Sequence, residues 1–412
     1  MQNRRELLRG LGLGLFAQGI GAGQEDSELR SPDLANLDGL MQWISEENEP
    51  RLSFLQGRWE SLEDWKQEAR PVFKELLHYD PDPRPLSGEV QSREDRDGFS
   101  IETLTISATD QYDIPAWLLL PDGADGPLPA VVAIHDHGGI YVWGQEKILS
   151  QPGELSAVTQ RRERFYERPF AEALARRGHV VLVIDGFYFG RRRLRPETMR
   201  AETAPPNVRD LLRELQGLEP DSLEWLRMVD RICRASETLT AKTIFAAGAT
   251  WPGLLVWDDM RSIDYLVSRP EVDPERIGCV GLSIGGLRTA YLAAADPRVK
   301  VSCVVGWMTR FKDQLRNKLR HHTWMVYLPG LAGQLDLPDA AALTAPGALM
   351  VQQCERDRLY PMEGMRGSVE RLEQIYAKAG IPERFKGEFY DVPHSFTTPM
   401  QESAFDWIEE WI

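Results

Sequence analysis

The chain has 412 residues, of which 42% are hydrophobic and 27% charged, so it is long and apolar enough to form a large folded core. Its 63 acidic residues outnumber 48 basic ones, and the resulting formal charge of −15 argues against a nucleic-acid partner. No stretch approaches the roughly 20 consecutive apolar residues that a membrane-spanning helix needs. Four cysteines are too few for a disulfide framework, and we expect them to be buried thiols.

The first residues have the pattern of a targeting segment. Arg4 and Arg5 precede a weakly apolar, glycine-rich run, which ends at the acidic Glu25 and Asp26. This order resembles a bacterial twin-arginine export signal, so residues 1–23 are predicted to be a signal peptide and the protein to be periplasmic or extracellular. The alternative is a frayed amphipathic start, with the protein remaining in the cytoplasm.

Residues 24–95 are acidic and carry aromatic and aliphatic side chains at helical spacing. They are predicted to form a helical N-terminal extension, which ends in a proline-rich linker at residues 81–85. The strand-like runs at residues 99–106 and 114–120 are separated by turn residues, and they predict an opening hairpin.

After the hairpin, short apolar runs alternate with longer helical stretches, which predicts a doubly wound, mainly parallel α/β domain over residues 96–412. The predicted strands are residues 130–134, 180–184, 277–280, 301–305, 348–352 and 385–390. The predicted helices are residues 163–177, 254–268, 284–295, 363–379 and 401–412. Residues 187–250 are too long for a simple connection and predict an inserted helical lid, with a helical piece at 211–229.

Ser283 is the candidate nucleophile. An apolar strand runs into Gly281-Leu282-Ser283-Ile284-Gly285, and an Ala- and Leu-rich helix follows at once. A serine hydroxyl is a weak nucleophile that must be presented to a base on a sharp turn, and small flanking residues allow that turn. The alternative interpretation is a glycine-rich turn with a solvated serine.

In a strand-to-helix site of this kind the acid and the base follow the serine along the chain. His394, between a predicted strand and the last helix, is therefore the candidate base; His321 and His322 are expected at a solvated helix end. Asp357, shortly before a helix-starting proline, is the candidate orienting acid, with Glu355 as the competitor. Either carboxylate has the alternative of a surface ion pair.

Two backbone N–H groups are needed to stabilise the oxyanion of an acyl-transfer reaction. The residue after the serine, Ile284, supplies one, and we assign the second to His137, beside the Gly138-Gly139 pair. The His-x-His spacing of His135 and His137 also allows a metal pair, although no third ligand is evident nearby. We expect neither a metal nor an organic cofactor.

Four further segments complete a family resemblance: His135 to Gly139, Asp185 to Arg191, Asp259 to Leu266 and Asp296 to Val299. With Ser283, Asp357 and His394 they make residues 98–412 similar to the α/β-hydrolase superfamily, in its dienelactone-hydrolase-like and acetyl-xylan-esterase-like branch. The resemblance implies a carboxylic ester hydrolase with a serine acyl-enzyme, in which serine replaces the cysteine of true dienelactone hydrolases.

The expected substrate is a small-molecule or carbohydrate ester. Several aromatic residues are candidates for stacking on a sugar or lining the acyl pocket, namely Tyr141, Trp143, Trp251, Trp257 and Trp307. Core packing is the competing interpretation for all of them. A serine peptidase of the prolyl-oligopeptidase kind and a catalytically silent binding module are the alternative functions, but about 70 N-terminal residues cannot build the propeller of the first.

Overall fold

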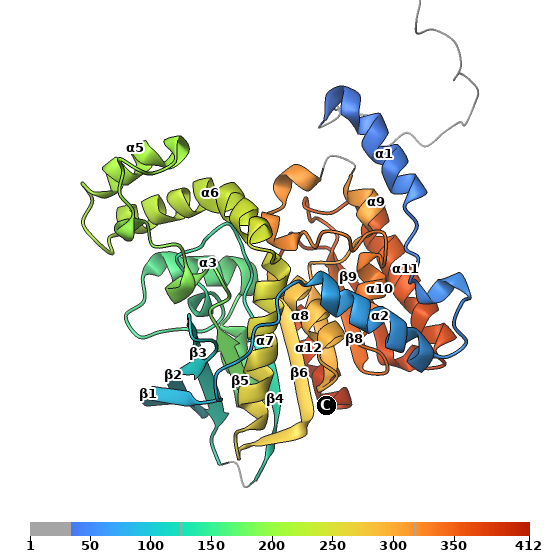
Figure 1. The fold of residues 1–412 in the computed structure, drawn as a ribbon. Helices are drawn as coiled ribbons and strands as arrows, with labels where there is room; N and C mark the ends of the chain where they lie inside the picture. Colours follow the sequence, from blue (N-terminus) through green and yellow to red (C-terminus); the bar gives the residue numbers. More distant parts are fainter. Residues whose placement is uncertain (1–33, 124–125, 316–317) are drawn as a thin grey trace, which may run out of the picture.

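A computed structural model describes residues 34–123, 126–315 and 318–412. Its strands are β1 (Gly88–Arg96), β2 (Phe99–Ser107), β3 (Asp113–Pro121), β4 (Leu128–Ile134), β5 (Val180–Ile184), β6 (Val272–Leu282), β7 (Val299–Val305), β8 (Ala348–Cys354) and β9 (Phe385–Tyr390). They form one sheet in the order β1-β2-β3-β5-β4-β6-β7-β8-β9 (Figure 1). Strands β5, β4, β6, β7, β8 and β9 are parallel, and β1, β2 and β3 pair antiparallel.

The α-helices are α1 (Asp38–Glu47), α2 (Leu62–Leu76), α3 (Ser156–Tyr166), α4 (Phe170–Arg176), α5 (Pro206–Leu215), α6 (Leu223–Ala246), α7 (Trp251–Val267), α8 (Ile284–Ala295), α9 (Phe311–Gln314), α10 (Leu337–Ala342), α11 (Met362–Lys378) and α12 (Thr398–Trp411). Short 3-10 turns are η1 (Ala35–Leu37), η2 (Phe54–Gln56), η3 (Gln145–Lys147), η4 (Gly190–Arg192), η5 (Pro196–Thr198), η6 (Leu319–His321), η7 (Trp324–Val326) and η8 (Pro382–Arg384).

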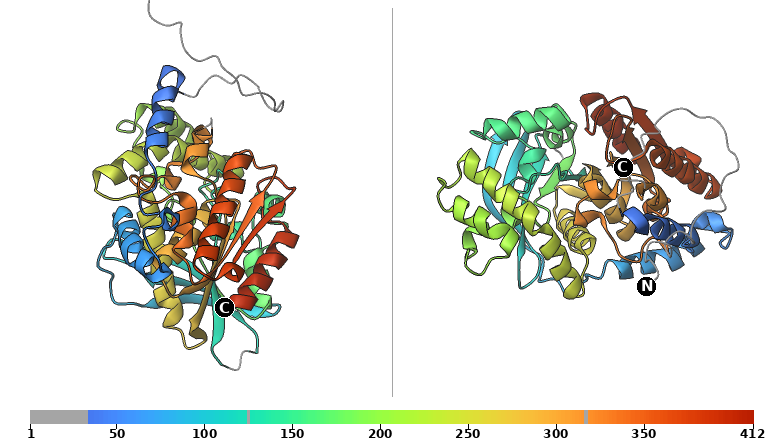
Figure 2. Two further views of the ribbon diagram at one scale, coloured as in Figure 1. Left: turned by 90° about the vertical axis from the view of Figure 1, so that its right-hand side faces the viewer. Right: turned by 90° about the horizontal axis from the view of Figure 1, so that it is seen from above.

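Helices cover both faces of the sheet, because consecutive strand residues point to opposite sides. In β4, Val131 packs with residues of α4 and α12, whereas its neighbour Val132 packs with residues of α7. Figure 2 shows the sheet between the blue N-terminal helices and the red C-terminal helix. Burial on both faces explains why these strands appear in the sequence as continuous apolar runs, and it confirms the predicted α/β fold.

The antiparallel edge of the sheet begins earlier than expected. The predicted hairpin is present, since β2 and β3 pair from Phe99 opposite Pro121 to Ser107 opposite Asp113. However, β1 lies within the segment predicted to be helical extension and linker, and it pairs with β2. Every residue of β1 is exposed or only partly buried, so the strand has no apolar alternation from which it could be predicted.

The helix predicted over residues 163–177 is wrong in its extent, because the structure has α3 and α4 in its place. Glu167 ends α3 in a left-handed conformation, with φ 62°, and Pro169 precedes α4. A proline removes a backbone donor and disfavours helical backbone in the residue before it. The break therefore follows from Pro169, which the apolar spacing alone does not reveal.

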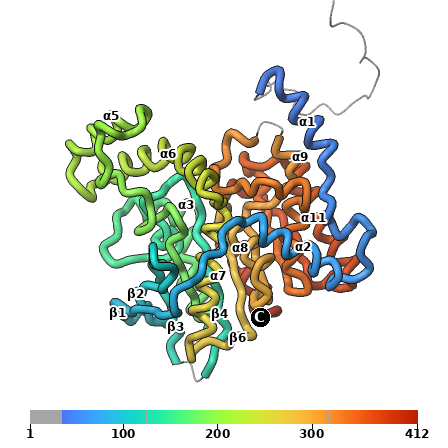
Figure 3. Tube along the Cα trace, viewed as in Figure 1, coloured from blue at the N-terminus to red at the C-terminus, as the bar shows by residue number. Residues whose placement is uncertain are grey.

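The N-terminal extension packs on the sheet-covering helices through α2. The Phe73 ring meets Tyr291 of α8 edge-on, with 5.2 Å between ring centroids, and Arg70 donates to the carbonyl of Ala294 at 2.9 Å. Figure 3 shows the chain then crossing α7 on its way to β1; there Thr250 Oγ1 donates to the Leu77 carbonyl at 2.6 Å. By contrast, α1 has no buried residue.

All four cysteines are buried and unpaired by disulfides, as expected. Within the described residues, no helix is both long and apolar enough to cross a membrane. The predicted signal peptide, residues 1–23, lies outside the described residues and stays a prediction.

Candidate active site

Ser283 lies on the turn between β6 and α8. Its backbone has φ 64° and ψ −121°, a conformation that costs a non-glycine residue about 1–3 kcal/mol. The turn is held by the Ser283 N–H, which donates to the Val305 carbonyl at 2.8 Å. A Cβ on Gly281 would lie 2.6 Å from the Gly285 backbone, and one on Gly285 would lie 2.5 Å from the Ile134 carbonyl oxygen. Both glycines of the motif are therefore required by close backbone contact.

His394 and Asp357 form a hydrogen-bonded pair at the same edge of the sheet. Their Nδ1 and Oδ2 atoms are 2.6 Å apart. The other carboxylate oxygen of Asp357 accepts the Leu359 N–H at 2.8 Å. Only 1% of the Asp357 side chain is exposed, against 17% of His394. The carboxylate is thus buried behind the imidazole, and its position is fixed by two hydrogen bonds.

Gly306, the residue after β7, brings His394 near Ser283. A Cβ on Gly306 would lie 3.3 Å from His394 Cε1, so the imidazole contacts this residue. The preceding carbonyl, of Val305, accepts the Ser283 N–H. Ser283 and His394 therefore contact adjacent residues of one turn, although in the described part of the chain no hydrogen bond joins the Ser283 hydroxyl to His394. Catalytic hydrogen bonds are often long before substrate binds.

The competing carboxylate Glu355 and His321 take no part in the His394–Asp357 pair, whereas His322 packs on the segment just after Asp357. The Glu355 side chain is about one-third exposed and forms an ion pair with Arg366, at 3.8 Å. His321 is exposed, as expected for a solvated helix end. His322 differs from that expectation, because its Nε2 lies 3.2 Å from the Leu359 carbonyl and its ring packs on Tyr360. Burial lowers the pKa of His322 to about 4, so this imidazole is neutral at physiological pH.

The loop after β4 lies against the Ser283 turn, because a Cβ on Gly285 would also come within 3.0 Å of the His135 carbonyl. Gly138 and Gly139 have positive φ angles of 52° and 72°, which let the loop turn back. Ile284 opens α8, where the first N–H groups have no intrahelical partner. Among the described residues the N–H of His137 also has no acceptor, so both predicted oxyanion donors are available.

His135 and His137 use ring nitrogens to shape this loop. His135 accepts the Gly186 N–H at Nε2, 3.2 Å away, and its Nδ1 lies 3.0 Å from the Asp136 carbonyl. His137 Nδ1 accepts the Gly139 N–H at 2.8 Å. Burial, together with the nearby Lys147 ammonium, lowers the pKa of His137 to about 3. Three of the four ring nitrogens thus have backbone partners, which disfavours the metal pair that the spacing allowed.

Asp136 fixes the position of this loop through bonds to helix α3. Its carboxylate accepts the Tyr166 hydroxyl at 2.6 Å and pairs with Arg161. Burial alone would raise the pKa of this carboxyl, but Arg161 and Lys147 hold it below its usual value. Asp136 is therefore an anionic anchor that joins α3 to the loop after β4, residues 135–139, which carries the predicted oxyanion donor His137 and is called the oxyanion loop below.

The predicted substrate-binding aromatics are mostly in the interior. Trp251 and Trp307 are at most 2% exposed and pack on Tyr188 and Tyr291, respectively. Trp257 is also buried. For these three positions burial favours core packing, the competing interpretation.

Tyr141 and Trp143 stay close to the oxyanion loop. The Tyr141 ring meets the His137 ring edge-on, with 5.0 Å between centroids. Although Tyr141 is fully buried, Trp143 is only partly so. Trp143 thus remains a candidate for substrate contact.

The insertion over residues 187–250 contains α5 and α6 rather than one helical piece. Both helices lie at the end of the molecule where the parallel strands finish (Figure 1). From α6, Arg234 donates to the Gly139 carbonyl at 2.6 Å. Glu237 accepts the Tyr141 hydroxyl and the Trp324 N–H, each at 2.9 Å. Helix α6 therefore connects the oxyanion loop to the segment around η7 and borders the site.

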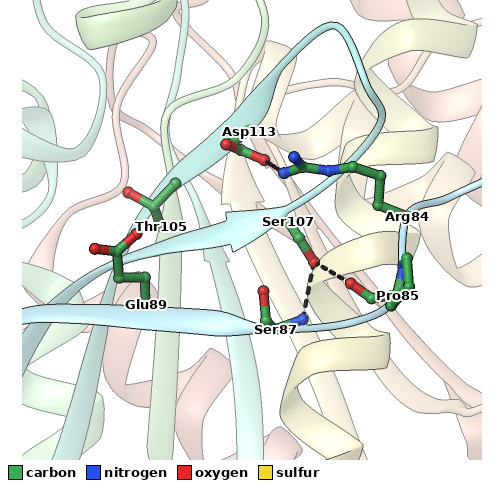
Figure 4. A pocket seen from close by; sticks show the side chains of 7 residues that line it. All are labelled: Arg84, Pro85, Ser87, Glu89, Thr105, Ser107 and Asp113. Carbon is green, nitrogen blue, oxygen red and sulfur yellow. Dashed lines mark hydrogen bonds and ion pairs between the residues drawn. The ribbon is translucent and has the colours of Figure 1, made fainter.

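A surface pocket away from Ser283 lies at the edge of the sheet formed by strands β1, β2 and β3 (Figure 4). Its volume is about 410 Å³. Ser107 Oγ accepts the Ser87 N–H and donates to the Pro85 carbonyl, both at 2.8 Å, while Arg84 pairs with Asp113. Its principal polar groups are thus bonded to one another. It shares no residue with the candidate active site.

A family model described as "Dienelactone hydrolase family" matches residues 167–408, more than half of the sequence. The chain belongs to this family. Membership of this family confirms the enzyme class predicted from the sequence, a hydrolase that acts on carboxylic esters.

Individual relatives agree with this assignment. Over 352 residues the chain is 27% identical to "Putative hydrolase YtaP" of Bacillus subtilis (strain 168), a match that covers 84% of this chain and 100% of that protein. A "putative acetyl xylan esterase" structure from Bacteroides fragilis NCTC 9343 has TM-score 0.62 at 15% identity and covers 85% of this chain and 81% of its own. A glucuronoyl esterase from Solibacter usitatus has TM-score 0.58 at 15% identity, covering 87% and 96%. At these identities the two structures show a shared fold.

Sequence reasoning missed Gly306 and the groups that hold the oxyanion loop, namely Lys147, Arg161, Tyr166 and Glu237. Gly306 directly follows an apolar strand, so the sequence shows a glycine at a strand end. Its contact with the His394 imidazole is evident only in the structure. The others lie in helical or loop segments whose charged residues look like ordinary surface residues until their burial is known.

Proposed function

We propose that the protein is a serine esterase that works through an acyl-enzyme. The observation that carries the proposal is the 2.6 Å contact between His394 Nδ1 and Asp357 Oδ2, beside a serine on a strained strand-to-helix turn. This is the arrangement that activates a serine hydroxyl: the acid fixes the imidazole tautomer, and the free ring nitrogen accepts the hydroxyl proton.

Each group then has a defined role. His394 Nε2 takes the proton from Ser283 Oγ as Oγ bonds to the ester carbonyl carbon. The N–H groups of Ile284 and His137 stabilise the oxyanion. The imidazolium gives its proton to the departing alcohol, and a water molecule activated by His394 releases the acid from Ser283. Asp357 remains ionised and stabilises the imidazolium.

For the substrate we propose an acyl ester of a carbohydrate. The structures that share this fold include a putative acetyl xylan esterase and a glucuronoyl esterase, as their names state. Trp143, partly exposed near the oxyanion loop, offers a ring for stacking on a sugar. The charge of −15 suits a neutral substrate better than a polyanionic one.

The test is hydrolysis of a panel of aryl acetates, acetylated xylo-oligosaccharides and uronate methyl esters by the wild-type protein and Ser283→Ala. We expect the variant to fold normally and to lose roughly three or more orders of magnitude in kcat, because only binding and the oxyanion donors remain. Near-normal turnover by Ser283→Ala would remove the serine mechanism. Activity on aryl acetates without any on sugar esters would remove the carbohydrate assignment alone.

A further inference from the structure

Lys147 is a fully buried lysine beside the oxyanion loop, with 0% of its surface exposed. Its Nζ donates to three backbone carbonyls: Asp136 at 2.9 Å, His137 at 3.0 Å and Ile140 at 2.8 Å. On another side, Nζ lies 4.4 Å from the centroid of the Phe189 ring. Lysine is almost never fully buried without a charged partner, so a buried lysine at this position needs an explanation.

The three carbonyl acceptors determine the charge of Lys147. Burial lowers the pKa of the amine to about 7. However, three acceptors within 3.0 Å require three N–H donors, and only the ammonium form has three. Within the described residues Lys147 forms no ion pair, and the Asp136 carboxylate instead binds Arg161 and Tyr166. The positive charge is therefore directed at the peptide carbonyls of the loop.

One of these carbonyls belongs to the same peptide unit as the predicted oxyanion donor. In a trans peptide the C=O of Asp136 and the N–H of His137 point in opposite directions. Because Lys147 holds this C=O, the His137 N–H must point away from the lysine, and it has no acceptor among the described residues. A cation bonded to a carbonyl oxygen also polarises the peptide, which makes the N–H at its other end a stronger donor.

We propose that Lys147 is a positioning residue for the reaction, which orients and polarises the His137 N–H toward the oxyanion. This inference rests on the proposed serine esterase function. Since the oxyanion develops only in the transition state, an interaction that strengthens its donor accelerates the chemical step and leaves substrate binding nearly unchanged.

The test uses Lys147→Met, which keeps an unbranched apolar side chain and removes the charge and all three donors. With 4-nitrophenyl acetate we expect kcat to fall about 10²-fold, the loss typical of one oxyanion donor, while KM changes less than about threefold. Binding of phenylboronic acid, which forms a tetrahedral anionic adduct with the serine, should weaken by a similar factor.

Lys378→Met is the control for loss of a lysine that bonds a backbone carbonyl outside the site. Lys378 is an exposed residue at the end of α11. Its Nζ donates to the carbonyl of Phe54 in η2 at 2.5 Å and lies 4.2 Å from the Phe54 ring centroid. We expect wild-type kcat and wild-type boronate affinity in this variant. Circular dichroism and thermal unfolding of both variants report whether the fold is retained.

Wild-type kcat in folded Lys147→Met would overturn the inference, and so would a loss that appears only in KM. If that variant does not fold, Lys147→Gln decides the question, because its amide keeps two N–H donors but lacks the positive charge: parallel falls in kcat and boronate affinity support the role, and unchanged values contradict it. Either negative result leaves the serine mechanism intact, whereas activity retained by Ser283→Ala would remove the mechanism itself.

Discussion

The two sides of the candidate active site are held in place by different means. On the triad side, Ser283, Asp357 and His394 follow the parallel strands β6, β8 and β9, so the register of the sheet sets their positions. On the oxyanion side, buried polar side chains from other segments fix the loop after β4: Lys147 and Arg161 are two of them. The difference indicates that the sheet sets the positions of the proposed triad, whereas the loop that carries the proposed oxyanion donor depends on a few buried hydrogen bonds.

The largest expected effect after loss of the nucleophile is on the triad side. Asp357→Asn should retain the fold and lower kcat by about 10⁴-fold, because an amide in place of the carboxylate favours the wrong imidazole tautomer. Glu355→Gln is the matched variant, from the same loop, and should cost little, since the Glu355 carboxylate pairs with Arg366 and, among the described residues, forms no hydrogen bond with His394. Steady-state kinetics of both variants decide between the two carboxylates. A nearly inactive Glu355→Gln beside a nearly normal Asp357→Asn would reverse the assignment.

This contrast also explains what the sequence could predict. The three triad residues lie just after strands that appear as apolar runs, so their order and spacing were sufficient to bring them together as hypotheses. The oxyanion anchors could not be found in this way, because Lys147 and Arg161 are charged residues whose burial arises from contacts distant in the sequence. For the same reason the sequence leaves pocket lining and core packing both open for Trp251 and Trp307, and their burial favours the core. Strand β1 is not evident in the sequence because none of its residues is buried, so it lacks an apolar alternation.

A smaller effect is expected where the triad depends on one glycine. Gly306 has φ 56°, and a Cβ there would lie 3.0 Å from Leu282 Cδ1 and 3.3 Å from His394 Cε1. Gly306→Ala should displace the imidazole and lower kcat by about 10²-fold, as a displacement of about 1 Å typically does. Gly380→Ala, at φ 76° with no atom within 4 Å, carries the same kind of backbone strain without touching the site. Equally lowered kcat values in the two variants would show that backbone strain, and not displacement of the imidazole, causes the loss of activity.

The smallest effect is expected at the border of the oxyanion loop. Glu237→Gln removes the carboxylate that accepts the Tyr141 hydroxyl and the Trp324 N–H. The Thr323 hydroxyl also donates to the oxygen that accepts the Trp324 N–H. Because an amide has one acceptor oxygen instead of two, either the Tyr141 hydroxyl or this pair of donors loses its acceptor, at a cost of about 1–3 kcal/mol in stability. We expect a lower Tm and a KM raised by less than about tenfold. Glu224→Gln, an exposed residue of the same helix, should change neither quantity.

The account depends most directly on Ser283 being the acylated residue. Peptide mapping after treatment of the purified protein with an aryl organophosphonate measures this, because such a probe reacts irreversibly with a serine activated by a histidine. The account predicts one modified residue, Ser283, with labelling abolished in Ser283→Ala and greatly slowed in Asp357→Asn. Stoichiometric modification of another residue, or a wild-type protein that hydrolyses esters but is not labelled, would contradict it.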